Sequence, residues 1–442
     1  MTPPKHSLLE GDVAPHLRRL SLPLALGMVG MTIASLADTY FLSHLGTRAL
    51  ASIGFTLPMV MFFLGVTFGL SIGTSSVLAR VYGEGDFEKM RQMSTDTLVL
   101  TALITTCASV FGVMLMTPAF VAMGAKDDIL SDVQIYMAIW YIGLPFFGLT
   151  MVANACIRAT GDTRYPAAIM LTMSGIQILI NPFLIFGWGP FPMLGFSGAA
   201  TSLLVSYIVT SGISFYFLIV RKKILSPVLW HVKTVDSWKR FLHIAVPAMI
   251  SNQIAPLSAA IITAMAAIYG KEAVAALGVA KRVEGMCILI FYALGAGVSI
   301  FVGQNFGAGN FGRIAAVINL GARWSLTIGF IMALVIWPFA AEIAEIFDKN
   351  PKVIAYTTQY FHWVPISFGV MGVMVLVNGA LNAMGRPLIA TSFIILNTVI
   401  LYVPLAWLLQ KQIGFLGIVI ALTMTNLFVG LLSFVYSRRG IS

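Results

Sequence analysis

Charged side chains are scarce in this sequence. Lys, Arg, Asp and Glu make up 10% of its 442 residues, whereas 58% are hydrophobic. Soluble globular domains carry roughly 25% charged residues. One soluble core could not bury so many apolar side chains, but a bilayer removes the need, because side chains that face lipid stay in hydrocarbon. The composition therefore excludes a soluble domain and indicates an integral membrane protein whose surroundings are the lipid bilayer.

The sequence also lacks patterns that redox, metal, nucleic-acid or enzymatic functions would need. Three cysteines lie singly within apolar runs, which predicts small buried hydrophobes: Cys107, Cys156 and Cys287. No block of five or more basic residues occurs, so the formal charge of +10 does not indicate a nucleic-acid partner. No His-Glu-x-x-His occurs, and the Gly-Lys pair Gly270-Lys271 precedes Glu272 rather than Ser or Thr. We therefore expect neither an enzyme nor an ATP-driven pump, with no catalytic residue, metal site or cofactor.

Apolar runs of about 20 residues, long enough to cross a bilayer as helices, occur twelve times. They lie near residues 17–44, 52–79, 94–118, 130–157, 164–187, 197–220, 241–268, 276–303, 320–343, 353–381, 388–409 and 414–437. A helix satisfies its own backbone hydrogen bonds in lipid, and the short alternating segments of a membrane barrel do not occur. No small-residue cleavage site follows the polar N-terminal segment, so we expect the first helix to be retained. The predicted fold class is all-α integral membrane with twelve transmembrane helices.

Basic residues set the predicted orientation. Those at the ends and connections on the side of the N-terminus outnumber those on the other side by about three to one. Because Lys and Arg accumulate on the cytoplasmic side, we expect a multi-pass protein of the inner membrane with both termini in the cytoplasm. The longest polar connection falls at the midpoint and divides the chain. The predicted domains are residues 1–222, a cytoplasmic linker at 223–238, and residues 239–442.

The two halves of the chain are similar to each other. A shift of 224 residues superimposes them without a gap over most of four helices. The matches include Pro23 with Pro247, Gly46 with Gly270, Gly73 with Gly297, Tyr136 with Tyr360, Asn154 with Asn378 and Gly161 with Gly385. An even number of helices per repeat gives both halves the same orientation, so we expect two homologous six-helix lobes around a central cleft. Repetition kept only for helix packing is the alternative, and we favour transport by alternating access.

The most informative residues are those that break the repeat. Asp38 lies well inside the first span, where the second half has Ile262. A charged residue at the centre of a membrane helix costs roughly 2.5–3.5 kcal/mol on insertion scales, and such residues usually handle ions or protons. Asp38 is predicted to be the only deeply embedded acid of the first half. Pro23 lies about four turns before Asp38 and predicts a kink, either passive or linked to the charge of Asp38.

Oxygen-bearing side chains lie at a depth similar to that of Asp38 on three other predicted helices. The candidate cation-coupling residues are Asp38, Gln177, Asn181, Thr201, Tyr136 and, in the repeated fourth helix, Asn154. The neutral groups can hydrogen-bond a protonated carboxyl or contribute to the oxygen shell of a small cation. Each of them alone is also compatible with interhelical hydrogen bonding only.

The second half has a different charged group. Lys281, Arg282 and Glu284 lie near the start of the eighth span, and Lys281 and Glu284 are spaced to form an i, i+3 pair. A charge cluster that lines a cleft and a neutralised interfacial pair remain equally open.

Several motifs resemble those of the multidrug and toxic compound extrusion (MATE) exporters. They are residues 158–166 (RATGDTRYP) after the fourth helix, 79–85 (ARVYGEG) after the second, 198–200 (GAA) opening the sixth, and 381–387 (LNAMGRP) in the second half. Leu36-Ala37-Asp38 with Pro23 looks like the prokaryotic branch named for DNA-damage-inducible protein F. The resemblance covers essentially the whole chain.

The resemblance implies export of cationic or amphipathic drug-like compounds by a functional monomer, driven by inward H⁺ or Na⁺. It also implies that Asp38 is the coupling carboxylate and that Pro23 marks a bend. Members of this branch often carry a second acid where this chain has Asn181. A single carboxylate binds Na⁺ less strongly, and burial favours its neutral form, so we predict H⁺ as the coupling ion. A lipid-linked oligosaccharide flippase of the same superfamily is the alternative, but its headgroup calls for a more cationic cavity.

Overall fold

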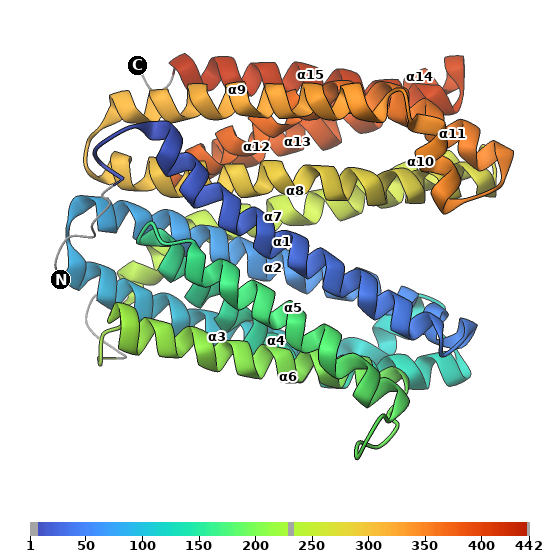
Figure 1. The fold of residues 1–442 in the computed structure, drawn as a ribbon, viewed down its shortest axis with the longest axis horizontal. Helices are drawn as coiled ribbons and strands as arrows, with labels where there is room; N and C mark the ends of the chain where they lie inside the picture. Colours follow the sequence, from blue (N-terminus) through green and yellow to red (C-terminus); the bar gives the residue numbers. More distant parts are fainter. Residues whose placement is uncertain (1–7, 229–233, 440–442) are drawn as a thin grey trace. The chain divides into compact units, whose positions relative to one another are not determined.

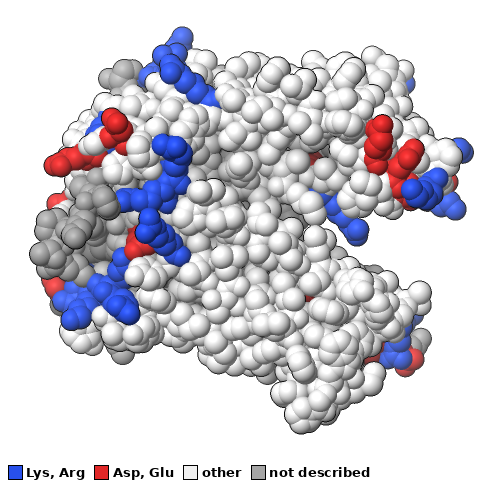
Figure 2. All heavy atoms as spheres, in the orientation of Figure 1, with Lys and Arg blue, Asp and Glu red and all other residues white. Residues whose placement is uncertain are grey.

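The computed structural model describes residues 8–228 and 234–439, and within these ranges the chain forms helices and loops without a β-strand (Figure 1). Twelve of its helical spans are long and apolar enough to cross a membrane. The predicted all-α, twelve-span fold is therefore confirmed. On the face drawn in Figure 2, charged side chains lie mainly toward the ends of the helices and few lie in the middle, as is usual in a bilayer.

The first six spans are uninterrupted helices. They are α1 (Val13–Ser43), α2 (Thr47–Glu84), α3 (Phe87–Ala122), α4 (Asp127–Ala159), α5 (Arg164–Phe186) and α6 (Phe196–Tyr216), the last continued by the π-helix η1 (Phe217–Lys222). Several run beyond the predicted apolar segments. The 38 residues of α2, for example, extend past both ends of the predicted 52–79, because a helix continues outside hydrocarbon as long as its polar residues keep their backbone hydrogen bonds.

The second half contains interrupted spans. Its elements are α7 (Thr234–Ala267), α8 (Lys271–Gly307), α9 (Phe311–Ile336), α10 (Ala340–Phe347), α11 (Pro351–Trp363), the 3₁₀ turn η2 (Val364–Ser367), α12 (Phe368–Ala383), α13 (Pro387–Ile395), the π-helix η3 (Leu396–Tyr402), α14 (Val403–Ile413) and α15 (Phe415–Arg439). Prolines account for the irregular turns, since Pro365 lies within η2 and Pro404 follows η3. The predicted ninth span at 320–343 was wrong at its end, because α9 stops at Ile336 before Pro338.

The chain divides into two compact units that differ from the predicted domains at their ends. One unit comprises residues 1–25 and 250–442, and the other comprises 26–249. Each boundary lies two residues after a repeated proline, Pro23 in α1 or Pro247 in α7. In the unit of residues 26–249, α4 packs against α2, α3 and α6; in the other, α12 packs against α8, α9 and α15. The chain therefore changes unit at equivalent positions of the repeat, within α1 in the first half and within α7 in the second.

Two glycines at equivalent positions of the repeat allow a close helix contact within each unit, one with the first part of α7 and the other with the first part of α1. A Cβ added to Gly73 of α2 would lie 2.8 Å from Cβ of Ala245 in α7. A Cβ added to Gly297 of α8 would lie 2.3 Å from Oγ of Ser21 in α1. Ser21 and Ala245 are themselves equivalent in the repeat, so the same helix contact is made once in each unit. Glycine is needed because any larger residue would separate the helices.

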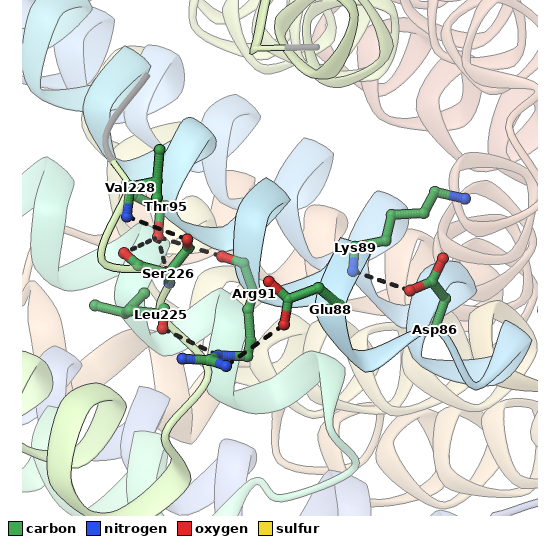
Figure 3. A network of polar contacts seen from close by, with 8 residues as sticks. All are labelled: Asp86, Glu88, Lys89, Arg91, Thr95, Leu225, Ser226 and Val228. Carbon is green, nitrogen blue, oxygen red and sulfur yellow. Dashed lines mark hydrogen bonds and ion pairs between the residues drawn. The ribbon is translucent and has the colours of Figure 1, made fainter. Parts of the chain in front are cut away.

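Hydrogen bonds hold residues 225 and 226, which precede α7, on α3 (Figure 3). Nε of Arg91 donates to the carbonyl of Leu225 at 3.1 Å, and the backbone N–H of Ser226 donates to Oγ1 of Thr95 at 2.9 Å. Residues 229–233 of the predicted linker lie outside the described residues, and residues 234–238 form the first turn of α7. The described part of this connection is therefore ordered by side chains of the first half.

Candidate functional site

Asp38 lies five residues before the end of α1, on a half-buried face of the helix. At 1.5 Å per residue, this places it about 7 Å from the end of the helix. No Lys or Arg forms an ion pair with its carboxylate among the described residues. The side chain is therefore an embedded acid whose described partners are neutral groups.

The carboxylate is held by a side chain of α5. Nδ2 of Asn181 donates to Oδ1 of Asp38 at 3.1 Å, and Asn181 is fully buried. The hydroxyl of Ser202 in α6 donates in turn to Oδ1 of Asn181. Because Ser202 occupies the amide oxygen, Asn181 presents its NH₂ group to Asp38. A chain of three side chains thus links α1, α5 and α6.

Two buried phenols complete the surroundings of Asp38. Tyr136 of α4 and Tyr207 of α6 are 3% and 6% exposed, and both lie near the Asp38 carboxylate. The ring of Tyr136 stacks on Phe196 at the start of α6, with 4.9 Å between the ring centroids. This packing holds Tyr136 in place near the carboxylate without a charged partner.

The other predicted site residues have no hydrogen bond to Asp38 among the described contacts. Gln177 is buried one turn before Asn181 on α5. Thr201 donates its hydroxyl to the carbonyl of Ser197 in its own helix at 2.9 Å. Asn154 of α4 is fully buried, and neither atom of its amide has a hydrogen-bond partner within the described residues. The structure thus joins Asn181 to Asp38 by a hydrogen bond, and it places the buried Tyr136 near the same carboxylate.

Two residues of this unit were missed from the sequence. The depth argument predicts Thr201 and not its neighbour Ser202, although Ser202, Ser206, Thr210 and Ser214 recur every four residues on one buried face of α6. Asp96 in α3 is fully buried and accepts a hydrogen bond from Thr234 at 3.2 Å. Asp96 lies two residues after the start of the predicted span at 94–118, so its burial does not bear on the expectation that Asp38 is the only deeply embedded acid of the first half.

A half-buried carboxylate among neutral donors can change its charge without breaking an ion pair. Its ionised form accepts the hydrogen bond from Asn181, and its neutral form suits an apolar environment. Such a group can therefore take up and release a proton during a conformational cycle. Coordination of a metal cation would need several oxygen atoms directed at one point, whereas Asn181 directs its NH₂ group toward Asp38.

Comparison with known proteins identifies the architecture. The MatE family model matches the chain twice, over residues 23–183 and 247–408, which correspond to the two halves of the repeat. The FAD transporter of Shewanella oneidensis is 34% identical over 98% of this chain and 96% of its own length. The probable multidrug resistance protein YoeA of Bacillus subtilis is 26% identical over 88% of this chain and 85% of its own length.

A solved structure has the same fold. The Vibrio cholerae MATE transporter VcmN in the bent form superimposes with a TM-score of 0.92 at 25% identity, over 97% of each chain. The resemblance noted in the sequence motifs is thereby confirmed. The double family match, the extended similarity to transporters and the twelve spans lead to one conclusion: this chain is a multi-pass membrane transporter that belongs to the MATE family.

Proposed function

We propose that the protein exports cationic or amphipathic organic compounds in exchange for H⁺, with Asp38 as the coupling carboxylate. The observation that carries the proposal is the hydrogen bond from the Asn181 amide to the half-buried Asp38 carboxylate, in surroundings without a described basic partner. Such a carboxylate can change its charge without breaking an ion pair. The relatives named as multidrug resistance proteins support an organic substrate.

H⁺ is favoured over Na⁺ by the donor set. Na⁺ needs a shell of oxygen atoms, and Asn181 offers its N–H groups to Asp38 while Ser202 occupies its oxygen. We further propose that Gln177, Tyr136, Thr201 and Asn154 line the same coupling region. Pro23 is proposed as the bending point, since the change of unit in α1 follows it closely.

The test is drug-driven proton movement in proteoliposomes that contain an entrapped pH-sensitive dye. Asp38→Asn keeps the size of the side chain but cannot take up a proton, so exchange of H⁺ for a cationic fluorescent substrate should be abolished. Asp128→Asn, at an exposed carboxylate that pairs with Arg48, is the matched control and should exchange normally. Unchanged exchange by Asp38→Asn would exclude Asp38 as the coupling site, and loss of exchange on removal of sodium would exclude H⁺ as the only coupling ion.

A flavin nucleotide is a second candidate substrate. The observation that favours it is the name of the Shewanella relative, FAD transporter, which matches nearly the whole chain at 34% identity. Uptake of FAD into everted vesicles from an exporter-deficient host, with and without this protein, distinguishes this substrate from cationic dyes.

We propose that the protein acts as a monomer in the inner membrane with both termini in the cytoplasm. A reporter fused after residue 439 tests the orientation.

A further inference from the structure

The unit that contains the second half has its own charged group within a membrane span. Lys281, Arg282 and Glu284 lie on α8, ten to thirteen residues after the helix begins at Lys271. Together they carry a formal charge of +1. The equivalent positions on α2 in the first half are Leu57, Pro58 and Val60, so the group is not part of the repeated scaffold.

Glu284 is the buried centre of this group. Its side chain is 8% exposed, and Nζ of Lys281 lies 2.7 Å from its Oε2. The hydroxyl of Tyr360 in α11 donates to the same oxygen, and Nζ of Lys281 lies 5.7 Å from the centroid of the Tyr360 ring. The predicted i, i+3 pair of Lys281 and Glu284 is therefore formed, and Tyr360 holds the carboxylate in place.

Lys281 is directed inward along the helix. A lysine near the end of a membrane helix usually extends its ammonium group toward the membrane surface. Here the ammonium group bends instead toward Glu284, which lies about one turn farther from the start of α8. The buried carboxylate thus acts as an internal counter-ion that keeps a cation away from the membrane surface.

The cation is nevertheless accessible. The side chain of Lys281 is 45% exposed, and Arg282 is exposed and forms no ion pair among the residues that the structure describes. Gly278 and Gly285, about one turn before and after, lie on the same face, and a Cβ built on either would meet no atom within 4 Å. Two basic side chains therefore border open space. Because exposure of such charges to lipid is costly, that space must admit water or a polar ligand.

A purely structural ion pair does not account for this face. One cation is enough to neutralise Glu284, and Lys281 already does so. Arg282 then remains as an unneutralised charge in a span, beside open space at Gly278 and Gly285. An anionic ligand would compensate that charge, and it would compete with Glu284 for Lys281.

We propose that Lys281 and Arg282 bind the phosphoryl group of an anionic amphipathic substrate, with flavin mononucleotide and dinucleotide as the representative class. Arg offers a planar fork of donors to phosphate and Lys offers a compact charge. Glu284 holds Lys281 in the unliganded state and is released from it when the phosphoryl group binds. The biological use of this site rests on the second candidate function, transport of a flavin nucleotide, but its binding selectivity does not depend on proton coupling.

The experiment measures binding of riboflavin, flavin mononucleotide and FAD to the full-length detergent-solubilised protein by isothermal titration calorimetry. These ligands share one ring system and carry no, one and two phosphates. The wild type should bind both nucleotides at least about tenfold more tightly than riboflavin. Lys281→Gln should weaken nucleotide binding about 10- to 100-fold, the range for a charge-assisted hydrogen bond, and riboflavin binding less than about threefold.

Three further variants separate recognition from loss of folding. Lys281→Arg should retain nucleotide binding, and Glu284→Gln should strengthen it, because Lys281 is then free while Tyr360 keeps a hydrogen-bond acceptor. Lys271→Gln, an exposed lysine at the start of the same helix, is the matched control and should match the wild type. A melting temperature for each variant shows that it is folded.

Several results would overturn the proposal. The wild type could bind all three flavins with equal affinity, or bind none of them. Lys281→Gln could weaken the binding of all three flavins equally, or Glu284→Gln could weaken the binding of the nucleotides. Displacement of the nucleotides by phosphatidylglycerol, without selectivity among flavins, would assign the basic face to lipid headgroups and also overturn it. The binding assay uses no proton gradient, so a negative result for Asp38 as the coupling residue would leave the binding results unaffected. Failure of nucleotide binding would in turn leave the test of Asp38 unaffected.

Discussion

The chain of hydrogen bonds from Ser202 through Asn181 to Asp38 allows a graded prediction. Asn181→Ala removes the donor that lies 3.1 Å from the carboxylate. A hydrogen bond to a charged group contributes about 1.5–3 kcal/mol, and each 1.4 kcal/mol corresponds to a factor of ten. The free-energy difference between charged and neutral Asp38 changes by this amount, so we expect H⁺-driven export to fall about 10- to 100-fold.

Ser202→Ala should have a smaller effect. It leaves the Asn181–Asp38 bond in place and removes only the neutral hydrogen bond that orients the amide. A neutral bond contributes about 0.5–1.5 kcal/mol, so we expect a decrease of about 2- to 10-fold. The expected order of loss is Asp38→Asn, then Asn181→Ala, then Ser202→Ala.

The assay is initial exchange of H⁺ for a cationic dye in proteoliposomes with equal protein content. Ser206→Ala is the matched control, because Ser206 is equally buried one turn along α6 and donates to the carbonyl of Ser202 at 2.7 Å, away from Asn181. If Ser206→Ala lost as much activity as Ser202→Ala, the effect would come from packing of α6. Equal losses for Asn181→Ala and Ser206→Ala would refute the hydrogen-bond chain altogether.

Two further predictions concern the scaffold. Gly73→Ala should lower the free energy of unfolding by about 1–3 kcal/mol, because its Cβ would press on α7. In the control Gly54→Ala on the same helix, the added Cβ meets no atom within 4 Å, so this variant should be neutral or stabilised by up to about 1 kcal/mol. The measurement is the melting temperature in detergent, and a similar decrease in both variants would contradict the prediction. Thr95→Val leaves the buried N–H of Ser226 without its acceptor, so amide hydrogen exchange of residues 224–228 should accelerate. In the wild type the Thr97 hydroxyl bonds within α3 at 3.0 Å, so Thr97→Val should leave the exchange of this segment unchanged. Equal exchange in both variants would show that Thr95 does not hold the segment on α3.

The fold was predictable because its determinants act locally. A run of about 20 apolar residues has to become a helix in lipid, so all twelve spans could be located without knowledge of their packing. The breaks at η2 and η3 were not predicted, although Pro365 and Pro404 are visible in the sequence. Hydropathy does not reveal whether a proline is accommodated by a kink or by a change of helix type, since neighbouring helices decide which backbone groups can be satisfied.

The candidate site was predictable in its acid and only partly in its partners. Asp38 stands out in any apolar run, and depth alone placed Asn181 beside it. Depth does not give rotation about the helix axis, and one residue corresponds to a turn of about 100°. Ser202 therefore contacts Asn181 while its neighbour Thr201 bonds to its own helix. The hydrogen bond from Thr234 of α7 to the buried Asp96 joins residues more than a hundred positions apart, and no local pattern contains it.

The repeated tyrosines show how a symmetric scaffold supports unequal chemistry. Tyr136 and Tyr360 are equivalent in the repeat, and both are buried. Tyr136 lies near Asp38, which comes from α1, whereas Tyr360 donates to Glu284, which comes from α8. Neither acid has an acidic counterpart, because the equivalent positions hold Ile262 and Val60.

Each unit thus keeps the tyrosine and takes its acid from a different helix. The acid in one unit has neutral partners, and the acid in the other is paired with Lys281. A proton neutralises the first without breaking an ion pair, whereas in the second the same step would leave Lys281 without its counter-ion. This difference is consistent with the different ligands that we propose for the two acids, a proton at Asp38 and, through the release of Lys281, an anion beside Glu284.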